Sequence, residues 1–245
     1  MSNPHPASRA LTMEEVRSVS PALADYTQKI IAGDLWSRPH LSARDRSIVT
    51  LAALIARAQT IGMPHYFNVA LDNGVTPTEL SEIITHLAFY SGWSSAFFAV
   101  EVLKGIYSAR GIGPDQLPEE PVEHLPIDEE SEALRAATVQ ENFGEVSQGL
   151  VDYTREVVFR DLWLRPGLTA RDRSLITVSA LVASGQQAQI TYHLNRAMDN
   201  GLTQAQASEM LVQIAYYSGW PSAFSAMPVV KDVFADRRKR AGSAG

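Results

Sequence analysis

The six histidines of this chain are the side chains best able to exchange a proton near neutral pH. His193 lies in a stretch with helical spacing, eight residues before Gly201. His86 lies four residues before Tyr90, a spacing that brings both side chains to one face of a helix. His65 and His86 could ligate a metal only with further ligands, and no clear carboxylate completes the set. These histidines are candidate functional residues, and we expect no metal site.

Two arginine pairs are candidates for binding an anion. An Arg-Asp-Arg motif occurs in LSARDRSIVT and again in LTARDRSLIT. Helical side chains two residues apart point about 200° away from each other, so both arginines of a motif cannot enter one pocket. At least one of each pair is expected to form a structural ion pair, and the other could present its planar fork to a carboxylate. The pattern does not separate Arg44 from Arg46, or Arg171 from Arg173.

These motifs belong to a duplication of a whole unit. A shift of 127 residues aligns the two copies without gaps from about Val19 to Lys104. The copies differ where Tyr66 of the first corresponds to His193 of the second, while His65 corresponds to Tyr192. Neighbouring helical residues differ by about 100° in direction, so His65 and His193 are expected to face different ways.

Each copy is predicted to be helical. Ser42 and Thr169 are predicted to cap helices with apolar residues at helical spacing. A second helix is expected from about residue 65 to 72, ending at Asn73-Gly74. A third is expected to begin at the capping box of Thr76 and to end at residues 91–92, with a fourth following. Since strand-like alternation is nowhere sustained, we expect an all-α fold of two similar units with approximate twofold symmetry.

The chain divides into two repeats and a linker. Residues 111–130 contain four prolines and many acidic residues, which marks them as the linker, with His124 exposed in it. The first repeat is expected to span 1–110 and the second 131–245. The basic run DRRKR at 236–240 is expected to be a solvated tail after the last helix.

Composition excludes several classes of function. The absence of cysteine excludes disulfides, thiolate metal sites and cysteine nucleophiles. A net charge of -6 argues against a nucleic-acid-binding protein. No apolar run approaches the roughly 18 residues that span a bilayer, so we expect a cytoplasmic protein without membrane contact. Phosphate-binding loops and nucleophile elbows are also absent from the sequence.

The second copy, with WLRPGLTARDRSLIT, His193, AMDNGLT and YYSGWPSAF, resembles the carboxymuconolactone decarboxylase family. The first copy matches with WSRPHLSARDRSIVT, ALDNGVT and FYSGWSSAF. The resemblance implies helical units that pack as rings, so a two-unit chain is expected to form a homotrimer. One branch of the family consists of thiol peroxidases with a CxxC pair, and a chain without cysteine cannot belong to it.

The other branch, typified by 4-carboxymuconolactone decarboxylase of aromatic catabolism, uses no cofactor. The resemblance therefore implies a cofactor-independent lyase that decarboxylates a small carboxylated lactone or enolisable acid. By position, His193 would be the acid or base, Arg165, Arg171 or Arg173 would bind carboxylate, and Tyr217 with Trp220 would line the pocket. The catalytic set expected from the second copy is His193, Arg173 and Tyr217.

The resemblance is incomplete around the histidine. Gln189 stands where the family commonly has an acidic residue, and Gly62 takes that place in the first copy. The first copy also lacks the family histidine, unless His65 or His86 replaces it. The remaining candidates for substrate binding are Gln189, Tyr66, His65, His86, Arg44 and Arg46. A related isomerase or hydrolase, or a non-catalytic oligomeric protein that binds a small ligand, remains an alternative.

Overall fold

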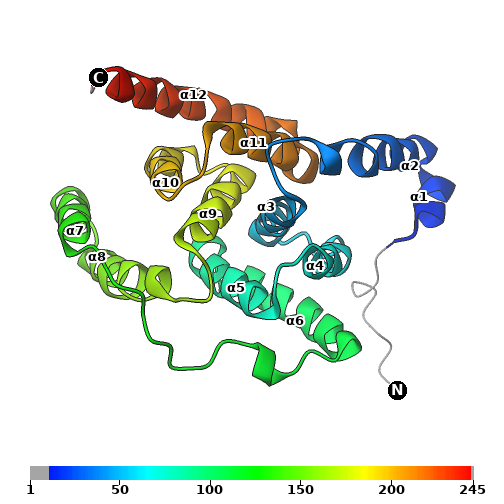
Figure 1. Ribbon diagram of the computed structural model, residues 1–245, viewed down its shortest axis with the longest axis horizontal. Coiled ribbons are helices and arrows are strands. Elements are labelled where there is room, and N and C mark those ends of the chain that lie inside the picture. Colours follow the sequence, from blue (N-terminus) through cyan, green and yellow to red (C-terminus); the bar gives the residue numbers. More distant parts are fainter. Residues whose placement is uncertain (1–10, 244–245) are drawn as a thin grey trace.

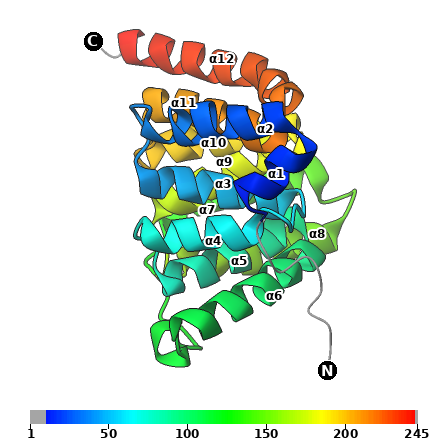
Figure 2. The same ribbon diagram turned by 90° about the vertical axis from the view of Figure 1, so that its right-hand side faces the viewer.

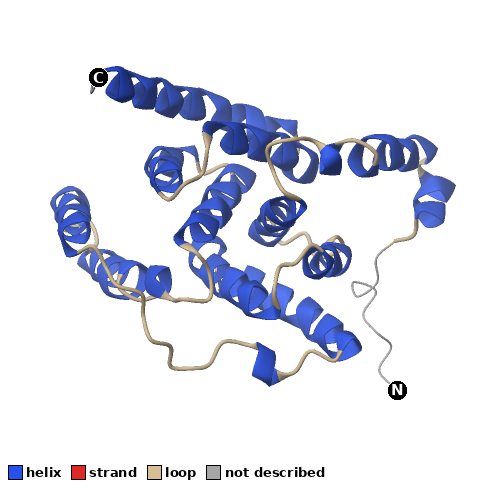
Figure 3. Cartoon of the chain, in the orientation of Figure 1, coloured by secondary structure: helices blue, strands red, loops and turns tan. Residues whose placement is uncertain are grey.

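The computed structural model describes residues 11–243, and within that range every regular element is helical (Figure 3). The first repeat supplies six α-helices: α1 (Met13–Val19), α2 (Pro21–Tyr26), α3 (Ala43–Ala56), α4 (Met63–Asp72), α5 (Pro77–Ser91) and α6 (Trp93–Arg110). The second supplies α7 (Glu129–Phe143), α8 (Gln148–Tyr153), α9 (Ala170–Ser184), α10 (Gln187–Asp199), α11 (Gln204–Ser218) and α12 (Trp220–Ser243). The all-α expectation is confirmed.

Local sequence signals set the ends of the main helices. The Ser42 side chain accepts a hydrogen bond from the Asp45 backbone N–H, which caps α3. Thr76 and Glu79 form the expected capping box at α5. Gly92 has φ 90°, which favours glycine and turns the chain sharply from α5 into α6. Gly219 makes the same turn in the second repeat with φ 91°.

The two repeats interlock around one core. Figure 1 shows α3 and α9 at the centre, with α5 and α6 on one side and α11 and α12 on the other. Figure 2 shows α6 and α12 at opposite edges of the stack. The helix α5 of the first repeat packs on α9, and α11 of the second repeat packs on α3. Each repeat therefore places one helix beside the central helix of the other.

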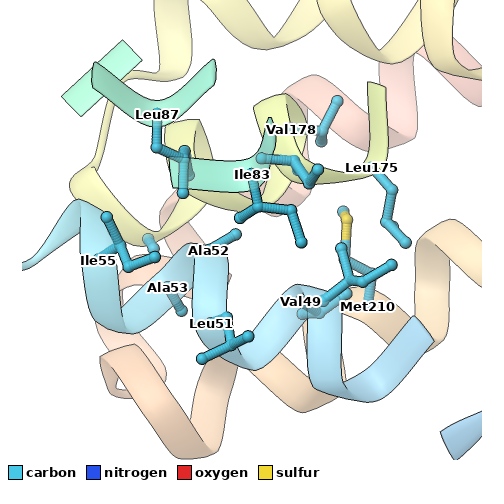
Figure 4. Packing of buried hydrophobic residues seen from close by; sticks show 14 of the residues in the cluster. Val49, Leu51, Ala52, Ala53, Ile55, Ile83, Leu87, Leu175, Val178 and Met210 are labelled. Atoms are coloured by element: carbon cyan, nitrogen blue, oxygen red, sulfur yellow. The ribbon is translucent and has the colours of Figure 1, made fainter. Parts of the chain in front are cut away.

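Buried apolar side chains from both repeats fill this core. Figure 4 shows Val49 of α3, Ile83 of α5, Val178 of α9 and Met210 of α11 in one cluster. All four are fully buried. Burying a side chain of this kind stabilises a fold by about 1.5–3 kcal/mol, so the core binds the repeats firmly together.

The C-terminal basic run differs from the expectation of a solvated tail. Residues 236–240 continue α12, which extends to Ser243. The run contains no helix breaker, and Arg237 forms an ion pair with Asp199 and a hydrogen bond with Asn195 of α10. The helix therefore continues across the run.

Two equivalent apolar faces remain exposed at opposite sides of the molecule. The α5–α6 face exposes Phe89, Trp93, Phe97 and Val100, and the α11–α12 face exposes Tyr216, Trp220, Phe224 and Met227. Each member of one set corresponds to a member of the other under the 127-residue shift. Within the described residues, no helix is both long and apolar enough to cross a membrane.

Candidate functional site

The structure contains two related sites, and each is built from both repeats. In the first, α5 presents Glu82, His86 and Tyr90, one turn apart, to α9 and α10 of the second repeat. In the other, α11 presents Glu209, Gln213 and Tyr217 to α3 and α4 of the first repeat. We call these the His193 site and the Tyr66 site, after the residue in which they differ most.

A buried ion-pair network forms the base of the His193 site. Arg173 is fully buried and donates hydrogen bonds to the Glu82 carboxylate at 2.7 Å and to the Arg165 carbonyl at 2.8 Å. Arg165 itself donates to Glu82 at 2.7 Å and pairs with Glu120 of the linker. Burial disfavours the ionised form of Glu82, but the hydrogen bonds from Arg165 and Arg173 outweigh it and lower the pKa of this carboxyl. The carboxylate is therefore ionised and fully engaged.

The Tyr66 site has the same base. Arg46 is fully buried and donates to Glu209 at 2.9 Å and to the Arg38 carbonyl at 2.8 Å. Arg38 also donates to Glu209, at 2.8 Å. Arg46 and Arg173 are thus committed to the scaffold in equivalent ways.

His86 and Gln213 occupy the next turn of helix and make equivalent contacts. The His86 Nε2 lies 2.7 Å from the Thr177 hydroxyl, which donates its proton to the Arg173 carbonyl, so Nε2 carries the proton. Nδ1 then faces Arg173 at 3.5 Å as an acceptor. In the other site the Gln213 amide accepts from Arg46 at 2.9 Å and donates to Thr50 at 3.0 Å. Burial, aided by the Arg173 charge, lowers the pKa of His86, so a neutral imidazole takes the place of an amide.

His193 is a buried imidazole without a hydrogen bond from Nδ1 to any described residue. It is 7% exposed, and its Nδ1 has no hydrogen-bond partner within the described residues. The ring packs between aromatic neighbours, with Tyr90 at 5.4 Å and Trp163 at 6.3 Å between ring centroids. Burial, reinforced by the charge of Arg196, lowers the pKa of His193 to about 4. The imidazole is therefore neutral at pH 7.

Arg196 lies one turn after His193 on α10, against the same aromatic wall. Its guanidinium carbon is 4.4 Å from the centroid of the Trp163 ring and 5.4 Å from that of Phe159. Its buried Nε has no partner, and none of the described residues forms an ion pair with it. Arg135 of α7 stacks on the other ring, Phe159, but is paired with Glu132. The His193 site thus contains one cation without a counter-charge.

Tyr90 completes the His193 site. Its hydroxyl accepts a hydrogen bond from Trp163 Nε1 at 2.9 Å, and no described residue accepts the hydroxyl proton. Burial raises the pKa of Tyr90, so the phenol remains protonated at neutral pH. It can therefore donate a hydrogen bond to a bound molecule.

In the Tyr66 site the hydroxyl of Tyr217, which corresponds to Tyr90, has both a donor and an acceptor. Trp36 Nε1 donates to the Tyr217 hydroxyl at 2.9 Å, which donates to the Tyr66 hydroxyl at 2.8 Å. The Tyr66 ring stacks on Trp36 at 6.0 Å. Val69 corresponds to Arg196, so this site lacks both the imidazole and the cation.

Comparisons with known proteins agree with this duplicated architecture. The model of the carboxymuconolactone decarboxylase family matches twice, over residues 21–105 and 148–232, and so covers more than half of the chain. The chain belongs to the carboxymuconolactone decarboxylase family.

Two similar members of this family are named as decarboxylases. The chain is 30% identical over 96 residues to the 4-carboxymuconolactone decarboxylase of Acinetobacter baylyi, a match that covers 39% of this chain and 72% of that protein. It is 32% identical over 104 residues to the nitrosuccinic acid decarboxylase of Metarhizium robertsii, covering 42% of this chain and 68% of the relative. Each match is about as long as one repeat.

A solved structure shares the fold over both repeats. It is assigned as a gamma-carboxymuconolactone decarboxylase subunit of Burkholderia xenovorans, and it superposes with a TM-score of 0.58 at 18% identity. The match covers 94% of this chain and 93% of the other. The fold of the chain, with both repeats, is therefore shared by another solved structure.

The structure separates residues that the sequence grouped in one pocket of the second copy. Tyr217 lies in the Tyr66 site, because α11 packs on α3, and Tyr90 stands beside His193 instead. Trp220 is 50% exposed on the outer α11–α12 face, because the chain turns away at Gly219. The tyrosine and tryptophan at the His193 site are thus Tyr90 and Trp163.

The outer arginine of each Arg-Asp-Arg motif holds the repeats together. Arg171 donates to both carboxylate oxygens of Asp45, and Arg44 reciprocates with Asp172 while pairing with Glu79. All four motif arginines are therefore in ion pairs. The sequence predicted an ion pair for at least one arginine of each motif and left the other as a candidate for binding a carboxylate. The reason is that acidic partners come from the opposite repeat, which a motif taken alone does not reveal.

The other predicted residues lie at the margins of the two sites. Gln189 is exposed in the first turn of α10, and no polar partner of its side chain is found in the described part of the chain. His65 is exposed and packs its ring edge-on against Tyr66 at 4.8 Å. No group of three or more potential metal-binding side chains occurs among residues 11–243. In the linker, His124 pairs with Asp161 at 2.8 Å and is partly exposed.

Four residues of the His193 site, Glu82, Arg196, Phe159 and Arg135, were not predicted from the sequence. Glu82 lies four residues before His86, so extending the helical face by one turn would have found it. Arg196 lies three residues after His193 on the same face, and Val69 in the other copy marks it as a difference between repeats. Phe159 and Arg135 carry no such signal, because they reach the site only through tertiary packing.

Proposed function

We propose that this chain is a cofactor-independent decarboxylase of a small carboxylated lactone or enolisable acid, with one reaction site, at His193. The observation that carries the proposal is a buried, neutral imidazole beside a phenol. Among residues 11–243, neither Nδ1 of the imidazole nor the proton of the phenol has a hydrogen-bond partner. Groups of this kind can serve proton transfer and charge stabilisation in a reaction that needs no metal.

The reaction can be written with these groups alone. The bond between the carboxylate carbon and the rest of the substrate breaks, carbon dioxide leaves, and the electron pair moves into a conjugated carbonyl to form an enolate. The Tyr90 O–H donates a hydrogen bond to the enolate oxygen. His193 takes up a proton from solvent when the anionic substrate binds, and its imidazolium form then protonates the enolate at carbon, which returns the neutral imidazole.

The low pKa of His193 suits both halves of this cycle. The free imidazole is neutral at pH 7, with a pKa of about 4. An anionic substrate beside it favours the protonated form, because an opposite charge nearby stabilises imidazolium. Loss of carbon dioxide leaves the negative charge on the enolate, whose carbon is far more basic than a carboxylate, so transfer of the proton from imidazolium to carbon becomes favourable.

The three arginines of the second copy that were predicted to bind carboxylate have no part in this proposal. Arg173 and Arg165 are bound to Glu82, and Arg171 to Asp45 and Asp172. Recruiting one of them would leave a buried carboxylate without its partner, which costs about 3–5 kcal/mol. The relatives named as decarboxylases support decarboxylation as the reaction class, and their names give two different substrates.

The test is an ultraviolet assay of purified protein with 4-carboxymuconolactone. We expect turnover by the wild type and a loss of about 10²–10⁴-fold in kcat for His193→Ala, the usual contribution of a positioned acid. Tyr66→Phe is the matched control, since it changes the equivalent position of the other site, and should retain activity within a few-fold. Equal inertness of wild type and His193→Ala would contradict the decarboxylase reading for this substrate.

We also infer that the chain associates with further copies of itself through its two apolar faces. The faces are equivalent under the 127-residue shift and lie at opposite sides of the molecule (Figure 1). The α11–α12 face contains a groove of about 450 Å³ lined by Trp220, Phe224 and Met227. Head-to-tail contact between such faces closes into a ring, and we expect a trimer. Light scattering of the wild type and of Phe224→Lys tests this, since a monomeric wild type would contradict it.

A further inference from the structure

Arg196 is the cation of the His193 site that the protein leaves without a counter-charge. Six arginines between the repeats, Arg38, Arg44, Arg46, Arg165, Arg171 and Arg173, all have carboxylate partners. Arg196 instead lies half-buried on the Trp163 and Phe159 rings, and its buried Nε has no partner. A guanidinium partly removed from water is stabilised by an anion, and here the anion must come from outside the described chain.

Two further groups near Arg196 also have a polar atom or proton without a partner among the described residues. His193, one turn earlier on α10, has a buried Nδ1 without a partner. Tyr90 lies across from it, with 5.4 Å between ring centroids, and its hydroxyl proton has no acceptor within residues 11–243. In the Tyr66 site the equivalent phenol is satisfied by Tyr66, and Val69 replaces the arginine.

We propose that Arg196 is the specificity-determining residue of the His193 site, and that it binds a carboxylate of a flat, conjugated substrate. This inference rests on the proposed function, because it concerns the same site. The planar fork of a guanidinium matches a carboxylate, and the buried rings of Trp163 and Phe159 hold that guanidinium in place beside His193.

The same contact links binding of the anion to the proton on His193. The charged and titratable groups around the ring are Arg196 and Tyr192 on α10, His86 and Tyr90 on α5, and the Arg135–Glu132 pair on α7. The phenols are neutral, the α7 pair cancels, and His86 is engaged by Thr177. A carboxylate on Arg196 therefore offsets the one uncompensated positive charge beside His193 and should bind together with a proton.

The probe is fumarate, a flat dicarboxylate, titrated into the full chain by calorimetry. We expect the wild type to bind one fumarate per chain, more tightly as the pH falls from about 8 to about 5.5. Arg196→Val, which installs the residue of the other repeat, should weaken binding by about 10- to 100-fold, as expected for lost charge-assisted hydrogen bonds. Arg196→Lys keeps the charge without the fork and should fall between. Arg110→Val removes an arginine of α6 that pairs with Asp72 outside the site, and should bind like the wild type.

Several outcomes would overturn the inference. They are no binding of fumarate by the wild type, equal binding by Arg196→Val, or equal binding of dimethyl fumarate, which has no charge. Binding of inorganic phosphate in preference to fumarate would overturn the choice of carboxylate. If Arg196→Val does not fold, the comparison of Arg196→Lys with wild type decides, since a role in stacking alone would leave its affinity and pH dependence unchanged.

Failure of this inference and failure of the proposed function give different results. Binding of fumarate through Arg196 without turnover of any lactone would support the Arg196 subsite and contradict the proposed decarboxylase activity. Turnover by the wild type, with KM and fumarate affinity unchanged in Arg196→Val, would support the decarboxylase activity and contradict the Arg196 subsite.

Discussion

The His193 site and the Tyr66 site share the same buried ion-pair network at their base, and they differ in the residues that lie next to it. In each, a fully buried arginine from one repeat meets a glutamate from the other, and a second arginine closes the pair. Above this base, one site has an imidazole and an unpaired guanidinium, and the other has a tyrosine and a valine. The base is therefore a requirement of packing between the repeats, and the layer above it is where function can diverge.

The largest effect should come from breaking the shared base. Glu82→Ala leaves Arg173 and Arg165 without their main counter-charge, and we expect it to cost about 3–5 kcal/mol of unfolding free energy. Glu209→Ala should cost less, because Arg38, one of its two partners, is 38% exposed and Arg165 is only 12% exposed. Urea unfolding measures both, with the exposed Glu101→Ala as control, expected within about 0.5 kcal/mol of wild type. A larger loss of unfolding free energy for Glu209→Ala than for Glu82→Ala would show that burial does not decide which of the two ion-pair networks is more stabilising.

The next effect separates the two sites by pH. His193 has a pKa of about 4 when folded and about 6.5 when unfolded, so the unfolded chain binds more protons between these values. Stability from this residue is therefore complete above about pH 6.5 and is lost as the pH falls toward 4, by about 3 kcal/mol in all.

His193→Tyr, which copies the residue of the Tyr66 site, should remove this part of the pH dependence. His86 also has a lowered pKa and will keep a similar slope in both proteins, so the difference between the two profiles is the quantity to measure. Urea unfolding at a series of pH values supplies it. Superimposable profiles would mean that His193 does not titrate as a buried imidazole.

The smallest effect concerns His86 and Gln213, which make equivalent hydrogen bonds in the two sites. Because Gln213 makes the same contacts as His86, we expect His86→Gln to change the unfolding free energy by less than about 1 kcal/mol. His86→Leu should cost about 1–3 kcal/mol, since Arg173 and Thr177 then lose a buried partner. Thermal and urea unfolding of both variants test this, and a glutamine as damaging as leucine would contradict the equivalence.

Much of the fold could be predicted because it depends on local signals. The 127-residue register, the Ser42 cap and the Thr76 capping box act within a few residues or between aligned copies, and the main helices begin and end where these signals indicated. Helices α1, α2, α7 and α8 were not predicted. Three of them have only six or seven residues, too few for a periodic pattern, and the only buried residue of α7 is Glu132, so this helix has no apolar stripe.

The site could be predicted only in part, because it is formed by contacts between repeats. His193 was singled out by a difference between the copies, and it does lie in a buried aromatic site. The partners assigned to it came from its own repeat, whereas α5 of the other repeat supplies Tyr90 and Glu82. Residue spacing along the chain does not reveal this exchange of helices between repeats. Tyr217 was therefore predicted to lie beside His193, whereas it contacts Tyr66.

The covalent joining of the repeats has a genetic consequence. If each repeat were a separate, identical chain, any codon change from histidine to tyrosine would alter every site of the pair at once. In the tandem chain, each position of the repeat is encoded twice, so one site can lose its imidazole while the other keeps it. Selection can therefore act on the two sites independently, within a single gene and a single core.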